Sequence, residues 1–330
     1  WRYYLETHGV DEAHLDPVEM AGQFTLTTGQ IRDAVASARN QAIRRGTPIQ
    51  QADLFAGARL HSGARLGDMA RNISARYGWD DIILPSDQVE ILRELVSTVR
   101  QRSKVLDEWG LGKKLASSGA VTVLFAGPPC TGKTMSAEVI AKDLGLDLYK
   151  IDLSNLVSKY IGETEKNLER IFTEAQSSNA ILFFDEADAI FGKRSGVKDA
   201  HDRYANLEIS YLLQRMETYD GVTILATNLR SNLDEAFLRR LQFAIDIPFP
   251  DEKHRLQIWE TLFPTSIPRA SDVDLADLAK RFRLAGCNIR NILVSAAYLA
   301  AADGGMITMQ HLLHGTRREF QKMGRLIMDT

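Results

Sequence analysis

The stretch that decides the fold reads Gly127-Pro128-Pro129-Cys130-Thr131-Gly132-Lys133-Thr134. It fits Gly-x-x-x-x-Gly-Lys-[Ser/Thr], a loop whose backbone N–H groups and following helix attract phosphate. In such a loop Lys133 reaches the β and γ phosphate oxygens, and Thr134 ligates Mg²⁺. The apolar residues 121–126 precede the loop, and the helix-compatible residues 135–144 follow it. This order predicts a strand, a phosphate-binding loop and a helix.

A second motif ends 52 residues after Thr134, where residues 181–186 read Ile-Leu-Phe-Phe-Asp-Glu. The burial of an apolar strand does not explain two carboxylates at its end. We assign Asp185 to the Mg²⁺ shell and Glu186 to the general base that activates the attacking water. Both motifs require the same fold, which argues against a chance match. The expected cofactors are ATP and Mg²⁺.

Composition sets limits on the class of protein. A chain of 330 residues that is 45% apolar and 25% charged suits two or three soluble domains. A net charge of −3 gives no electrostatic reason to expect nucleic acid, and apolar runs are too short for a membrane span. Without a signal peptide, the expected location is cytoplasmic. Cys130 and Cys287 suggest a reducing compartment and no disulfide framework. Because the chain starts at Trp1, we expect it to be a fragment.

Strand-like runs alternate with helical patterns along the middle of the chain. Their alternation predicts a parallel sheet wrapped by helices. The runs cover residues 121–126, 148–153, 180–184, 222–226 and 244–248. Three sets of apolar residues at helical spacing predict helices with one buried face. The sets are Leu168, Ile171, Phe172 and Ala175; Ile209, Leu212, Leu213 and Met216; and Leu275, Leu278, Ala279 and Phe282.

The first 59 residues repeat the C-terminal segment at a constant offset of 258, with 16 identities and no gap. Shared helical composition is one explanation, but matches of Trp1 with Trp259 and Phe24 with Phe282 favour a common architecture. We therefore predict four parts. These are the helical lid of a truncated first module (residues 1–65), a linker (66–76), a large α/β nucleotide-binding domain (77–250) and a second helical lid (251–330).

Together these motifs resemble the AAA ATPases (AAA+), over about residues 77–317. The resemblance implies a P-loop NTPase with a three-layer αβα parallel sheet and a C-terminal helical lid, preceded here by the lid of a first AAA module. Asn228 would orient the attacking water or contact the γ-phosphate, or else cap its strand. Arg239 or Arg240 would be an arginine finger for the neighbour in a ring, which implies a homo-hexamer. Many relatives separate two arginines here, so the choice between Arg239 and Arg240 stays open.

The same resemblance implies further nucleotide contacts. Ile82 would lie against the base, and Ile258, Gly286 and Cys287 would close over base and ribose, although an isoleucine is more often simply core. Arg290 is either a second sensor or a surface ion-pair partner. Close relatives usually carry glycine in place of Cys130, which we interpret as tolerated variation rather than a redox switch. The predicted contacts are Asp81, Ile82, Gly127, Pro128, Pro129, Cys130, Thr131, Gly132, Lys133, Thr134, Met135, Ile258, Gly286 and Cys287.

The substrate signal is Lys159-Tyr160-Ile161, which resembles the pore loop of protein-remodelling AAA ATPases. An exposed tyrosine in a surface loop is the alternative. We predict a ring motor that hydrolyses ATP to remodel, unfold or thread a protein client. A nucleic-acid motor or clamp-loader-like ATPase, and an ATP-binding scaffold without turnover, are the rival hypotheses. Residues 78–84, 150–172 and 193–206 also resemble a bacterial subgroup found beside phage-tail-like contractile injection systems, so a component of such a system is the more specific client.

Overall fold

The computed structural model describes residues 1–10, 14–24, 26–61, 70–115, 119–156, 163–176, 180–188, 200–228, 235–264 and 266–324. Its contacts divide into two compact units. The first unit comprises residues 1–79, 90–126 and 134–246, and the second comprises 80–89, 127–133 and 247–330. Within the described ranges, no helix is both long enough and apolar enough to cross a membrane.

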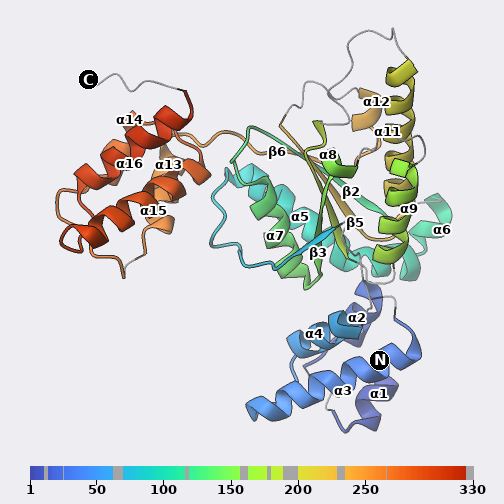
Figure 1. Ribbon diagram of the computed structural model, residues 1–330. Helices are drawn as coiled ribbons and strands as arrows, with labels where there is room; N and C mark the ends of the chain where they lie inside the picture. Colours follow the sequence, from blue (N-terminus) through green and yellow to red (C-terminus); the bar gives the residue numbers. More distant parts are fainter. Residues whose placement is uncertain are drawn as a thin grey trace. The chain divides into compact units, whose positions relative to one another are not determined.

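A six-stranded sheet in the order β1-β3-β4-β5-β2-β6 forms the centre of the first unit (Figure 1). The five predicted strands are confirmed and run parallel to one another. They are β2 (Val121–Ala126), β3 (Leu148–Asp152), β4 (Ile181–Asp185), β5 (Val222–Thr227) and β6 (Phe243–Asp246). The edge strand β1 (Arg71–Ile73) pairs antiparallel with β3 and lies where we predicted a linker. Three largely exposed residues carry no strand pattern, so only the pairing identifies β1.

Helices cover the sheet on both faces. They are α5 (Ser86–Ser103), the π-helix η2 (Lys104–Glu108), α6 (Leu111–Leu115), α7 (Lys133–Leu144), α8 (Leu153–Leu156), α9 (Glu163–Gln176), α11 (Ala200–Thr218) and α12 (Glu235–Leu238). The predicted stripes of α9 and α11 are buried and pack against every second residue of the strands, including Leu182 and Phe184. Figure 1 shows α5 and α7 on the other face. The strands are therefore buried on both sides, as expected for a parallel sheet.

Residues 1–61 form a helical region that belongs to the first unit. Its helices are α1 (Arg2–Thr7), α2 (Pro17–Gln23), α3 (Thr28–Arg45) and α4 (Gln51–His61). Arg59 on α4 donates a hydrogen bond to the carbonyl of Gly145, just beyond α7, at 3.1 Å. The ring of Phe55 covers the same glycine, 3.2 Å from where a Cβ would lie. The helical region is thus attached to the sheet domain by α4.

The helices of the second unit form a bundle around Trp259, which is fully buried. They are α13 (Glu252–Leu262), α14 (Leu275–Arg281), α15 (Gly286–Ala302) and α16 (Met309–Lys322). The predicted stripe from Leu275 to Phe282 lies in this core. Each of α2, α3 and α4 begins 258 residues before its counterpart α14, α15 or α16. The repeat in the sequence is therefore also a repeat in the starts of these three helices, whereas the division into two modules stays a prediction.

Candidate active site

The carboxyl ends of β4 and β5 bring the predicted catalytic residues of the first unit together. These strands are neighbours in register, and the N–H of Ala187 donates to the carbonyl of Ala226 at 3.0 Å. Asp185 therefore lies at the same edge as Asn228. Glu186 follows β4 with a φ of +55°, a left-handed conformation that is unusual for a residue other than glycine. Such backbone strain clusters at functional sites, which supports a role for this exposed carboxylate.

Asp188 is a residue of this edge that sequence reasoning missed. It accepts hydrogen bonds from the hydroxyl of Thr227 at 2.7 Å, and from the backbone and side-chain amides of Asn228 at 3.0 and 3.3 Å. Burial by itself would raise the pKa of Asp188, but these hydrogen bonds outweigh it and lower that pKa. Asp188 therefore stays ionised and holds the Asn228 amide. A third acidic residue two positions after Glu186 was the available signal.

Asp185 carries the chemistry expected of a Mg²⁺ ligand. One of its carboxylate oxygens accepts from the backbone N–H of Glu186 at 3.0 Å, and the other pairs with Lys150 Nζ of β3 at 2.5 Å. Thr134 lies in the first turn of α7. A carboxylate and a hydroxyl are the hard oxygen donors that suit Mg²⁺. Among the described residues there is no cluster of three or more His, Cys, Asp or Glu side chains that could hold a metal ion.

The phosphate-binding loop, residues 127–133, lies in the second unit, and two of its glycines are physically required. Gly127 has a φ of +156°, and a Cβ there would lie 2.0 Å from the carbonyl oxygen of Ile247. Gly132 has a φ of +112°, which other residues rarely adopt. Lys133 Nζ donates to the carbonyls of Gly127 at 2.7 Å and Pro128 at 2.9 Å. The ammonium group is thus held over the loop that the motif predicted.

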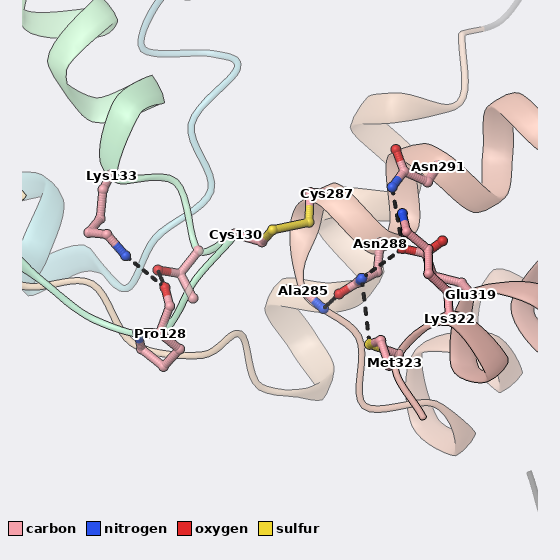
Figure 2. The surroundings of a disulfide bond; sticks show 11 residues. Pro128, Cys130, Lys133, Ala285, Cys287, Asn288, Asn291, Glu319, Lys322 and Met323 are labelled. Carbon is pink, nitrogen blue, oxygen red and sulfur yellow. Dashed lines mark hydrogen bonds and ion pairs between the residues drawn. A yellow bond between two sulfur atoms is a disulfide. The ribbon is translucent and has the colours of Figure 1, made fainter. Parts of the chain in front are cut away.

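The prediction of no disulfide is wrong. Cys130 and Cys287 are bonded through their sulfurs, with their Cα atoms 5.4 Å apart (Figure 2). Cys130 has a φ of +66°, so the backbone at this position is of the kind that suits glycine. The pair was missed because 157 residues separate the two cysteines, and only the fold brings them together. Cys130 thus has a bonded partner, which our interpretation of it as tolerated variation did not include.

A shallow pocket of about 320 Å³ lies in the second unit, next to the predicted adenine contacts. Ile82, Ile83 and Leu84 line the pocket, and Ile82 is 8% exposed. The neighbouring Asp81 is exposed. Ile258 instead packs against the core around Trp259. Gly286 lies near the loop, because a Cβ on it would be 3.7 Å from the carbonyl oxygen of Cys130. The nucleotide contacts of these residues, and of half-buried Met135, stay predictions.

The two arginines lie at the opposite edge of the sheet. The hydroxyl of Thr122, at the amino end of β2, donates to the carbonyl of Arg240 at 3.2 Å. Arg239 and Arg240 are exposed, and Arg240 pairs with Glu217 at 3.7 Å. Arg290 is exposed on α15. The predicted pore-loop residues Lys159, Tyr160 and Ile161 lie outside the described residues.

Comparisons with known proteins agree with this geometry. Residues 123–250 match the family described as "ATPase family associated with various cellular activities (AAA)". The chain is 33% identical over 258 residues to the proteasome-activating nucleotidase of Methanopyrus kandleri, covering 76% of this chain and 58% of the relative. It is 30% identical over 226 residues to the 26S proteasome subunit RPT4 of Saccharomyces cerevisiae, covering 66% of this chain and 50% of the relative.

A third relative is the peroxisomal ATPase PEX1 of Cricetulus griseus. It is 34% identical over 239 residues, covering 70% of this chain and 18% of the relative. The chain thus spans 50% to 58% of the length of the first two relatives and a smaller part of the third.

Proposed function

We propose that the protein, whose residues 123–250 match the AAA ATPase family, binds ATP with Mg²⁺ and hydrolyses it to remodel proteins. One observation carries the proposal. At a single edge of the sheet, Asp185 ends β4 and Glu186 follows it, while the amide of Asn228 after β5 is held by Asp188. An ATPase that activates water for attack on phosphate needs three groups: a metal-binding carboxylate, a second carboxylate and a positioned amide.

The connectivity of the chain supports a phosphate site at this edge. The phosphate-binding loop leaves the end of β2, which is the neighbour of β5, and returns to the first unit at Thr134. Lys133 would contact the phosphate oxygens after giving up its bonds to the loop carbonyls. Asp185 and Thr134 would hold Mg²⁺, which when bound neutralises charge on the phosphate oxygens.

Glu186 is proposed as the general base that takes a proton from the attacking water. Asn228 would orient that water. The contact with Asp188 fixes which way the Asn228 amide faces, since its nitrogen points at a carboxylate. Asp188 is therefore a positioning residue, which acts through Asn228.

The position of the two arginines supports a ring. They lie at the amino edge of β2, whereas Asp185 lies at the carboxyl edge of the sheet. Six strand residues separate the two edges, which is roughly 16–20 Å at about 3.3 Å per residue. Neither arginine reaches the carboxylate edge of its own protomer, so Arg239 or Arg240 would act on a neighbouring protomer. The assembly we propose is a homo-hexamer.

The client proposed is a protein. Lys159, Tyr160 and Ile161 support this through their resemblance to a pore loop, and two relatives carry the proteasome in their names. A component of a contractile injection system, in the cytoplasm, is the more specific proposal and depends on sequence resemblance alone. Nucleic acid and membranes are not expected partners.

The test of catalysis compares Glu186→Gln with the parental protein. Removing a general base should lower ATP hydrolysis by about 100-fold or more and leave ATP binding intact. Turnover is measured by phosphate release, and binding with a fluorescent ATP analogue. If Glu186→Gln hydrolysed ATP at the parental rate, the base would be misassigned.

The test of the client uses Tyr160→Ala and its matched control Tyr160→Phe. The alanine variant should keep ATP hydrolysis within a few-fold while losing remodelling of a model protein substrate, because only aromatic contact area is removed. The phenylalanine variant should retain most of the remodelling activity. Unchanged remodelling by Tyr160→Ala, or stimulation of hydrolysis by DNA, would count against a protein pore.

A further inference from the structure

The disulfide between Cys130 and Cys287 joins two segments that lie far apart in the sequence. Cys130 is in the middle of the phosphate-binding loop, and Cys287 is the second residue of α15. Both belong to the second compact unit. The bond therefore ties a loop that is expected to hold phosphate to the first turn of a helix far along the chain (Figure 2).

The backbone on both sides is shaped for this contact. Cys130 adopts a left-handed φ of +66°, and its carbonyl oxygen is 3.7 Å from where a Cβ of Gly286 would lie. That distance is an ordinary van der Waals contact, so the loop and the start of α15 lie against each other at Gly286. The approach of loop and helix thus involves main chain as well as the two sulfurs.

The start of α15 is held in place by polar contacts of its own. The backbone N–H of Ala285 donates to the side chain of Asn288 at 3.1 Å, and Asn288 donates to Glu319 of α16 at 3.0 Å. Asn291 donates to the same carboxylate oxygen at 3.3 Å. Figure 2 shows these side chains grouped on one side of the disulfide. Cys287 is therefore fixed to the bundle, and the bond passes that restraint to the loop.

In the disulfide-bonded form, Lys133 is engaged with its own loop. Its ammonium group donates to the carbonyls of Gly127 and Pro128 at 2.7 and 2.9 Å. A lysine that contacts phosphate has to give up such bonds, and the loop has to open its backbone N–H groups to the ligand. A covalent link from Cys130 to α15 limits both changes.

We propose that Cys130 and Cys287 are a redox modification site, whose disulfide lowers ATP binding and turnover and whose reduction restores them. This inference rests on the proposed ATPase function. The ligand class is a small-molecule disulfide such as oxidised glutathione. Cys130 is exposed to such a reagent, whereas Cys287 is half-buried at a helix N-terminus, where a negatively charged sulfur is favoured.

The chemistry balances as a thiol–disulfide exchange. The Cys130 thiolate attacks oxidised glutathione, forming a mixed disulfide and releasing one glutathione thiolate. The Cys287 thiolate then attacks the Cys130 sulfur, forming the protein disulfide and releasing a second glutathione. The two protein thiols are oxidised, the glutathione disulfide is reduced, and the two protons end on the two glutathione molecules. Excess dithiol reverses both steps.

The first measurement is the ratio of ATPase rates of one preparation before and after reduction. The oxidised protein should be slower by at least about fivefold, the lower end of ordinary coupling between sites. Peptide mapping without reductant confirms the Cys130–Cys287 link in the oxidised sample. In Cys130→Ser and Cys287→Ser the rates before and after reduction should be equal, whatever their absolute values. A link that maps correctly but leaves the ratio at one would overturn the inference.

The second measurement does not depend on turnover. If the disulfide weakens ATP binding, ATP must by linkage disfavour the disulfide to the same extent. The Glu186→Gln protein is equilibrated in glutathione buffers of graded redox ratio, with and without Mg·ATP, and free thiols are counted by alkylation and mass spectrometry. ATP should shift the midpoint toward more oxidising buffers. No shift, with ATP shown to bind, overturns the inference, whereas a reduced protein that neither binds nor hydrolyses ATP overturns the proposed function instead.

Discussion

The N-terminal helical region (residues 1–61) and the C-terminal bundle of α13–α16, which we predicted to be a lid (residues 251–330), use the same helical plan but contact different partners. In both, an aspartate caps a short helix: Asp16 for α2 and Asp274 for α14. In both, an amide side chain caps the long third helix, since Gln30 and Asn288 accept from the backbone N–H groups of Thr27 and Ala285. The shared caps explain why the helix starts keep the offset of 258.

The difference lies at the first turn of the long helix. The lid has Cys287 there, bonded to the phosphate-binding loop, and the N-terminal region has Gly29 at the corresponding position. The N-terminal region instead contacts the sheet domain through Arg59 and Phe55. The N-terminal copy thus attaches to the sheet domain, and the C-terminal copy is bonded to the phosphate-binding loop. Phe55 corresponds to Leu313, and Cys287 corresponds to Gly29, so these side chains differ between the copies. Arg59 is matched by Arg317, so this arginine alone does not determine which contact forms.

The largest expected effect comes from the tryptophans that match in the repeat. Trp259 is fully buried, while Trp1 is only half-buried. Trp259→Ala should therefore destabilise the lid by about 3–5 kcal/mol, and Trp1→Ala should cost its region clearly less. Hydrogen exchange of the α13–α16 amides measures the first change and that of α1–α4 the second.

Trp259→Phe is the matched control. The indole N–H of Trp259 is buried and finds no hydrogen-bond partner in the part of the chain that the structure describes. Phenylalanine removes this donor and keeps much of the ring, so it should retain most of the protection. Equal losses from Trp259→Ala and Trp1→Ala would show that burial in the two copies is not as different as described.

A middle-sized effect is expected from the matched glycines. A Cβ on Gly57 would lie 2.3 Å from the carbonyl oxygen of Ala34, and a Cβ on Gly315 would lie 3.1 Å from that of Ile292. Gly57→Ala should destabilise the contact of α3 with α4 by about 1–3 kcal/mol, because main chain has to move. Gly315→Ala should cost less. Hydrogen exchange in each helix pair decides the order, and the reverse order would contradict the closer approach in the N-terminal copy.

The smallest effect is expected from the two caps. Asp16 accepts from the backbone N–H groups of Val18 and Glu19, both at 2.9 Å, and Asp274 accepts from that of Asp277 at 2.9 Å. Asp16→Ala and Asp274→Ala should each cost about 1 kcal/mol, while the asparagine variants keep the acceptor and lose little. Hydrogen exchange of the first backbone amides of α2 and α14 measures how far each helix frays. A cost in one copy alone would mean that the repeat keeps helix positions without keeping the strength of their caps.

The sequence by itself determined the parts of this protein that depend on local pattern. Five strands, the buried faces of α9 and α11, and the loop around Lys133 follow from apolar spacing and from glycines that the backbone requires. The repeat was also detectable from the sequence, because identical residues at a fixed offset can be found without a structure. Asp185 and Glu186 stood out because carboxylates at the end of a buried strand have a cost that packing does not explain.

Only the tertiary structure decided which distant groups meet. The edge strand β1 exists because β3 offers it a partner, and Asp188 matters because β5 brings Asn228 beside it. The pairing of Lys150 with Asp185 depends on the register of β3 against β4. The bond between Cys130 and Cys287 spans 157 residues. No local propensity encodes such contacts, since they arise from the sheet order and the packing of the whole unit, which a reading of neighbouring residues does not contain.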